Sequence, residues 1–187
     1  MTPAADIAWR SARLHLACGA KRLPGWVNAD ADPAPLIRGA RGAPDIVLDA
    51  ARDLAALPDG ELAQVYWSHG PEHLPPDLLP GALAHLRRAL APGGCLTIAT
   101  TDLWAILTRR FPDGNWEGPL FGHRHSTDAP WLAHHDCFTP AKLTRLLRAA
   151  GFAMVRPWAL AGYPAIAALG DYASTHADVT LYLEGVA

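Results

Sequence analysis

The fold is decided by residues 13–30, RLHLACGAKRLPGWVNAD. Two short apolar runs, 13–17 and 26–29, stand on either side of a turn that contains Gly19. A strand that ends in a glycine turn and is soon followed by a second strand is typical of a parallel sheet that is buried on both faces. The second run ends at Asp30. Ligands of open α/β sheets bind outside the carboxyl ends of the strands, so the turn and Asp30 are candidate binding residues.

The rest of the chain repeats this pattern. Further strands are predicted at 45–48, 64–67, 95–99, 153–158 and 179–184, and helices at 78–90 and 139–150, where apolar residues recur with a period near 3.6. Thr139 and Pro140 form a helix start, and Gly151 follows the helix end. Residues 92–94, Pro-Gly-Gly, are expected to stop the first helix, and residues 1–11 to form a short leading helix. Strands that alternate with helices predict an α/β, doubly wound sheet.

Length and composition predict a single domain, 1–187, with a long loop insertion at about 111–136. A hydrophobic share of 50% and a charged share of 18% exclude a disordered chain, and a net charge of −2 disfavours nucleic-acid binding. We find no apolar run of about 18 residues and no signal peptide, so no membrane association is expected. The three cysteines lie far apart without a Cys-x-x-Cys pair, which suits a reducing, cytoplasmic location.

The motifs in their order resemble those of the class I S-adenosylmethionine-dependent methyltransferases. The matching segments are 14–19 (LHLACG), 23–30 (LPGWVNAD), 45–49 (DIVLD), 68–74 (SHGPEHL), 90–94 (LAPGG), 135–139 (HDCFT) and 150–152 (AGF). The resemblance implies a Rossmann-like, three-layer fold whose seven-stranded sheet is mostly parallel with an antiparallel last strand. It also implies S-adenosylmethionine as the cofactor and an enzyme that methylates an acceptor that we cannot identify from the sequence.

The resemblance further assigns site residues. Cofactor binding falls to Ala17, Cys18 and Gly19 at the methionine part, Asp30 at the ribose hydroxyls, Asp49 near the adenine, and Ser68 beside the methionine moiety. His69 lies next to the departing methyl group, and His135 is the candidate base that takes a proton from the nucleophile. Simpler interpretations stay open: a plain turn at Gly19, Asp32 in place of Asp30, and a helix N-cap at Asp49.

Several positions depart from the family pattern. His15 stands where members usually have an acid, Ala17 where they have glycine, and Gly70-Pro71 where they have an apolar pair. The first crossover, between Gly19 and Asp30, is short and is expected to hold a turn instead of a helix. These departures keep an alternative open, a non-catalytic binding or interaction module with a weakened cofactor site. A nucleotide-dependent oxidoreductase is disfavoured because Gly-x-Gly-x-x-Gly is absent.

The segment 111–136 is rich in histidine and aromatic residues. Its histidines and Cys137 are possible zinc ligands, but no four ligands stand at a familiar spacing, so no metal is predicted. The histidines could instead be satisfied surface groups, and the aromatic residues could pin the loop to the core. We expect the segment to form a lid over the ligand end of the sheet that carries His135 toward the methyl position. The oligomeric state stays open.

Overall fold

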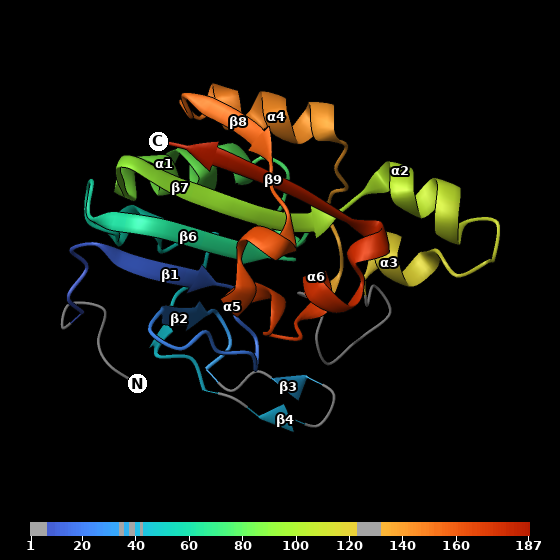
Figure 1. The fold of residues 1–187 in the computed structure, drawn as a ribbon, viewed down its shortest axis with the longest axis horizontal. Helices are drawn as coiled ribbons and strands as arrows, with labels where there is room; N and C mark the ends of the chain where they lie inside the picture. Colours follow the sequence, from blue (N-terminus) through green and yellow to red (C-terminus); the bar gives the residue numbers. More distant parts are fainter. Residues whose placement is uncertain (1–6, 34–35, 38–39, 42, 123–131) are drawn as a thin grey trace.

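The computed structural model describes residues 7–33, 36–37, 40–41, 43–122 and 132–187. The strands are β1 (Ala12–Leu16), β2 (Val27–Asp30), β3 (Leu36–Ile37), β4 (Ala40–Arg41), β5 (Ile46–Val47), β6 (Leu62–Ser68), β7 (Leu90–Thr101), β8 (Met154–Pro157) and β9 (Thr180–Val186). Seven of them form one sheet in the order β5-β2-β1-β6-β7-β9-β8, and β3 pairs with β4 (Figure 1). The strands from β5 to β7 run parallel, whereas β9 is antiparallel to both neighbours. This arrangement confirms the predicted fold class.

The helical segments lie between and beside these strands. The α-helices are α1 (Leu79–Ala89), α2 (Leu103–Ala105), α3 (Glu117–Phe121), α4 (Pro140–Ala149), α5 (Pro164–Ala167) and α6 (Tyr172–Thr175). The 3-10 turns are η2 (Leu54–Ala56), η3 (Pro71–His73), η6 (Leu160–Gly162) and η7 (Ala177–Val179), and η4 (Ile106–Arg110) is a π-helical turn. The Thr139 side chain accepts from the Lys142 N–H, which confirms the predicted N-cap of α4.

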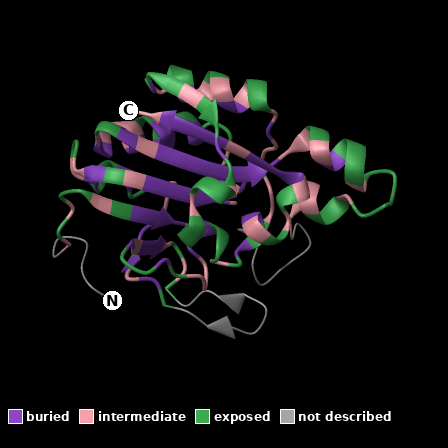
Figure 2. Ribbon diagram, viewed as in Figure 1, coloured by how far each residue is buried: buried purple, intermediate pink, exposed green. Residues whose placement is uncertain are grey.

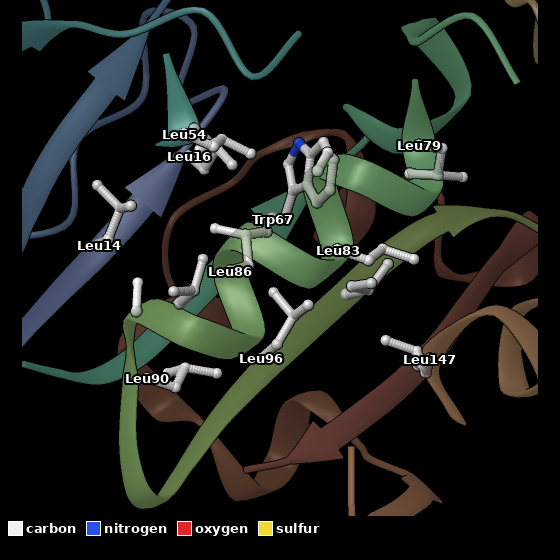
Figure 3. Packing of buried hydrophobic residues seen from close by; sticks show 14 of the residues in the cluster. Leu14, Leu16, Leu54, Trp67, Leu79, Leu83, Leu86, Leu90, Leu96 and Leu147 are labelled. Atoms are coloured by element: carbon white, nitrogen blue, oxygen red, sulfur yellow. The ribbon is translucent and has the colours of Figure 1, made fainter. Parts of the chain in front are cut away.

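One face of the sheet is covered by the two long helices, α1 and α4 (Figure 1). Alternate residues of β6, Val65 and Trp67, face this side and join a single buried cluster with leucines of both helices, such as Leu83 and Leu147 (Figure 3). Successive side chains of a strand point to opposite faces, so Tyr66 and Ser68 belong to the other side. The middle of the sheet is buried along most of its length (Figure 2).

The opposite face is covered by the chain between β8 and β9, residues 158–179. Its Trp158, Ile166 and Ala173 form a second buried cluster with Tyr66. This segment includes α5, which lies across the sheet, and α6, which lies near the carboxyl ends of β1 and β6 (Figure 1). The first crossover adds no α-helix to this face, because residues 19–26 form turns, as the sequence predicts.

Three local predictions are corrected by the structure. Residues 92–94 do not form a separate stop after α1. The helix ends at Ala89, and Pro92, Gly93 and Gly94 lie within β7, where the pairing with β6 jumps from Leu90 to Cys95 and leaves them in a bulge. The segment 111–136 is not all loop, since α3 lies within it. Residues 7–11 are not helical, and the rest of the predicted leading helix lies outside the described residues.

Candidate functional site

The turn after β1 brings the first predicted cofactor residues together. Ala17 and Gly19 both have left-handed backbone angles, with φ of 55° and 54°. Glycine adopts this conformation freely, whereas alanine is strained there by roughly 1 kcal/mol. The Gly19 N–H donates to the Asp30 carboxylate at 2.8 Å, and the Cys18 N–H donates to the Ala29 carbonyl at 3.0 Å. The turn therefore keeps the shape of a glycine turn and is tied to the end of β2.

Asp30 and Asp49, which end the second and third predicted strands, lie in different surroundings. Burial raises the pKa of Asp30, while its hydrogen bonds from the Asp32 and Gly19 N–H groups act against that rise. Asp49 caps the turn that follows it, because its Oδ1 accepts from the Ala51 N–H at 2.8 Å. The capping role that the sequence left open for Asp49 is thus present, in a turn instead of an α-helix.

Ser68 and Tyr66 bind a carboxylate that comes from far along the chain. Asp171, at the start of α6, accepts from the Tyr66 hydroxyl at 2.7 Å and from the Ser68 hydroxyl at 2.8 Å through the same oxygen. Its other oxygen accepts from the Ser174 N–H at 2.9 Å and caps α6. Burial would raise the pKa of Asp171, but these hydrogen bonds, first that from Tyr66, lower it. Asp171 therefore fastens α6 over the carboxyl end of β6.

His69 follows β6 with a left-handed backbone, φ 46°, and both of its ring nitrogens have partners. Its Nδ1 lies 2.7 Å from Glu72 Oε1, and its Nε2 lies 3.3 Å from the Thr180 hydroxyl oxygen. That hydroxyl donates its own proton to the His176 carbonyl at 2.8 Å, so it accepts from His69. The imidazole therefore lies between a buried carboxylate and a hydroxyl oxygen, which hold it from both sides.

Glu72 is the centre of this cluster and is fully buried. Its second carboxylate oxygen accepts from the Thr100 hydroxyl at 2.7 Å, and its backbone carbonyl accepts from the His135 N–H at 2.8 Å. Complete burial would raise the pKa of Glu72, but His69, through its charge and its hydrogen bond, lowers it to about 2. A buried carboxylate is stable here because its charge is paired and each oxygen has a donor.

Three more histidines lie along the same loop cluster. His73 Nδ1 is 3.1 Å from the Ala133 carbonyl oxygen, and its ring meets that of His134 edge-on with centroids 4.7 Å apart. Burial lowers the pKa of His134 to about 4, so this ring is neutral at pH 7. His135, the predicted base, is exposed and is held through its backbone by Glu72. His123 and His125 lie outside the described residues.

His15, which replaces the family's acid, is buried beneath the turn. Its ring stacks on Tyr66 with centroids 5.2 Å apart, and its Nδ1 lies 3.2 Å from Asn28 Oδ1. Burial lowers the pKa of His15 to about 4, although the bond to Asn28 opposes the change. A neutral imidazole at this position gives no negative charge to attract an ammonium group.

Two cavities border this end of the sheet. One, of about 200 Å³, lies against α1 and begins at Ala50, directly after Asp49. The other, of about 180 Å³, is lined by Arg110, Asn115, Pro119, Tyr172 and His176. Tyr172 also meets the ring of His69 edge-on, with centroids 4.6 Å apart, so the second cavity is one side chain away from His69.

The sequence did not single out Asp171, Tyr172 or Thr180, and it included Glu72 only within the matching segment 68–74. The Glu72 signal was present as Ser-His-Gly-Pro-Glu-His after a predicted strand. The sequence around Asp171 gave no sign of a role in the site, because a single aspartate before Tyr-Ala-Ser is typical of an ordinary helix N-cap. In the described part of the chain, no three His, Cys, Asp or Glu side chains converge so that they could hold a metal ion.

The strand order and the direction of β9 define the class of fold: this is the α/β fold of the class I S-adenosylmethionine-dependent methyltransferases. No family model matches the chain, and no curated protein does. No helix in the described residues has the length and apolar character needed to cross a membrane.

Solved structures of this fold resemble the chain over most of its length. An S-adenosylmethionine-dependent methyltransferase from Mesorhizobium loti is 16% identical, with a TM-score of 0.56, and the match covers 94% of this chain and 90% of that one. An S-adenosylmethionine-dependent methyltransferase from Thermotoga maritima is 17% identical, with a TM-score of 0.56, and the match covers 94% of this chain and 81% of that one. Another from Archaeoglobus fulgidus is 14% identical, also with a TM-score of 0.56, and the match covers 95% of this chain and 86% of that one. At these identities the likeness establishes the fold, and the activity is a separate question.

Proposed function

We propose that the chain is an S-adenosylmethionine-dependent methyltransferase. The observation that carries this proposal is the turn after β1, which keeps two left-handed residues and lies against the Asp30 carboxylate in a sheet of class I order. A turn of this shape lets a ligand approach the backbone closely. Ala17 supports the proposal, because the turn keeps its left-handed backbone at this position although the residue is alanine and not the usual glycine.

In this proposal the cofactor lies over the carboxyl ends of β1, β2 and β6. Ala17, Cys18 and Gly19 border its methionine part, Asp30 accepts hydrogen bonds from the ribose hydroxyls, and Asp49 lies at the adenine end. Ser68 stays beside the methionine part, where it is held by Asp171. When bound, the cofactor supplies an electrophilic methyl group on a sulfonium, so the protein has to orient a nucleophile in line and take up its proton.

His69 and His135 take different parts in this scheme. Both nitrogens of His69 are engaged by Glu72 and Thr180, so we assign it a positioning role that holds the loop after β6. His135 is exposed and adjacent to that loop, and it keeps the predicted role of base. Substitution His135→Ala should lower turnover by about 10²–10⁴ with cofactor affinity nearly unchanged.

Titration calorimetry with S-adenosylhomocysteine tests the cofactor site. Asp30→Asn keeps the shape of the side chain and one acceptor for the Gly19 N–H, and it should weaken binding about tenfold to a hundredfold by removing the charged acceptor. Asp32→Asn, two residues away, is the matched control and should bind within about twofold of the wild type. Failure of the wild-type protein to bind S-adenosylhomocysteine would refute the proposal. If Asp32→Asn weakened binding more than Asp30→Asn did, the ribose contact would belong to Asp32.

A second candidate function rests on His15. Because this buried ring is neutral, the site lacks the negative charge that would attract the cofactor's ammonium group. This observation favours a non-catalytic module with a weakened cofactor site. His15→Asp separates the two candidates: a module whose site has decayed should gain affinity for S-adenosylhomocysteine, whereas a competent enzyme should already bind it and lose stability.

A further inference from the structure

Asp171 brings a buried negative charge to the ligand end of the sheet. One of its carboxylate oxygens accepts from both Tyr66 and Ser68, and 8% of the residue is exposed. The next residue, Tyr172, meets the ring of His69 edge-on. The start of α6 therefore lies against Ser68 and His69, which are the residues expected beside the methionine part and the methyl group of the cofactor (Figure 1).

The charge of Asp171 is held by neutral groups. Its side chain accepts from the hydroxyls of Tyr66 and Ser68 and from the Ser174 N–H. No Lys, Arg or His side chain among the described residues forms an ion pair with it. Although burial raises the pKa of Asp171, its hydrogen bonds, first that from Tyr66, lower it overall, so the carboxylate is charged at pH 7. A buried charge without a counter-charge is costly, and a cation from a ligand would compensate it.

Asp171 also acts on the position at which the family's acid is replaced. His15 stacks on Tyr66, whose hydroxyl donates to Asp171. Burial lowers the pKa of His15 to about 4, while its bond to Asn28 and then the charge of Asp171 act in the opposite direction. The neutral His15 does not attract an ammonium group, but a carboxylate close to it does. The negative charge that β1 lacks is therefore present on α6.

We propose that Asp171 binds the ammonium group of the cofactor's methionine part, in place of the acid that His15 replaces. The assignment rests on the proposed function, because its ligand is the cofactor. Oδ2 already accepts from two hydroxyls, whereas the hydrogen bond to Oδ1 comes from the Ser174 N–H, so Oδ1 keeps a lone pair for an ammonium N–H. On this assignment the neutral His15 does not weaken the cofactor site.

Titration calorimetry with two ligands tests this contact. S-adenosylhomocysteine carries the ammonium group, and its analogue with hydrogen in place of the α-amino group does not. The wild type should bind S-adenosylhomocysteine at least about tenfold more tightly than the analogue, because only the first ligand forms a charge-assisted hydrogen bond with a largely buried carboxylate.

Asp171→Asn should remove this preference. It should weaken binding of S-adenosylhomocysteine at least about tenfold and bind the analogue at least as tightly as the wild type does, because the analogue places no cation at this residue. Asparagine caps helices as well as aspartate does, so α6 keeps its N-cap. Asp171→Ser also keeps a capping side chain without the charge; it should give the same pattern and serves if Asp171→Asn does not fold.

Asp178→Asn is the matched control. It removes a negative charge from the same segment between β8 and β9, but this carboxylate pairs with Arg110 and has no contact with Ser68 among the described residues. The variant should bind each ligand within about twofold of the wild type.

The outcomes separate this assignment from the proposed function. Equal binding of the two ligands by the wild type would overturn the role of Asp171, while the binding of S-adenosylhomocysteine would still support a methyltransferase. Equal weakening of both ligands in Asp171→Asn would also overturn it, because a residue that only fastens α6 would have this effect. If the wild type bound no S-adenosylhomocysteine, the proposed function would be refuted, and this assignment with it.

Discussion

Glu72→Gln tests whether the buried Glu72 carboxylate, paired with His69 beside β6, stabilises the protein. Glu72 is fully buried, and each of its carboxylate oxygens is 2.7 Å from one donor, Oε1 from the His69 ring and Oε2 from the Thr100 hydroxyl. The amide keeps the size of the side chain but removes the charge opposite the imidazole. The loss of the charged acceptor from both of these buried hydrogen bonds should lower the free energy of unfolding by about 2–4 kcal/mol at pH 7.

The pH dependence makes this prediction specific to the charge. The folded-state pKa of Glu72 is about 2, below its ordinary value of 4.5, so its stabilisation is complete above pH 4.5 and is lost as the pH falls toward 2. The difference between wild type and Glu72→Gln should therefore shrink by about 1.4 kcal/mol per pH unit below pH 4.5.

Urea unfolding followed by tryptophan fluorescence at pH 7, 5 and 3.5 measures both effects. Asp59→Asn is the control, because it breaks the pair with Arg88 at a carboxylate that is 73% exposed and should leave stability unchanged. If Glu72→Gln unfolds at the same urea concentration as the wild type, the stabilising role of the pair is wrong. A difference that is the same at pH 5 and at pH 3.5 would contradict the assignment to the carboxylate charge.

Three further substitutions test the loop after β6, the turn after β1 and the attachment of α6. Gly70→Ala should destabilise the protein by about 1–3 kcal/mol in the same unfolding assay, because the new methyl group would collide with the buried indole of Trp67. Ala17→Gly should change stability by no more than about 1 kcal/mol, since relief of the left-handed strain opposes the added freedom of the unfolded chain; a large loss would contradict the strain argument. Asp171→Asn should lower stability by about 1–3 kcal/mol and speed amide hydrogen exchange in α6 selectively, because Ser68 loses its charged acceptor; uniform exchange would count against a local latch.

The local pattern of the sequence was sufficient for the seven strands of the main sheet and for the two long helices, α1 and α4. Short apolar runs between turns predicted the strands, and the capped, periodic segment before Gly151 predicted α4, because these signals depend on residues close together in the chain. The short first crossover was also predictable, since so few residues separate Gly19 from Asp30.

Only the tertiary structure decided how the site is assembled. Asp171 lies 105 positions from Tyr66 and 103 from Ser68, and no local pattern relates residues at such distances. The same holds for Thr180, 111 positions from His69. Because the first crossover contributes no α-helix, the exposed face of the sheet had to be covered by another part of the chain, and the segment between β8 and β9 does so. Which distant segment buries that face depends on packing over the whole sheet, so the sequence alone determined the strands and the turn but not the side chains that lie above them.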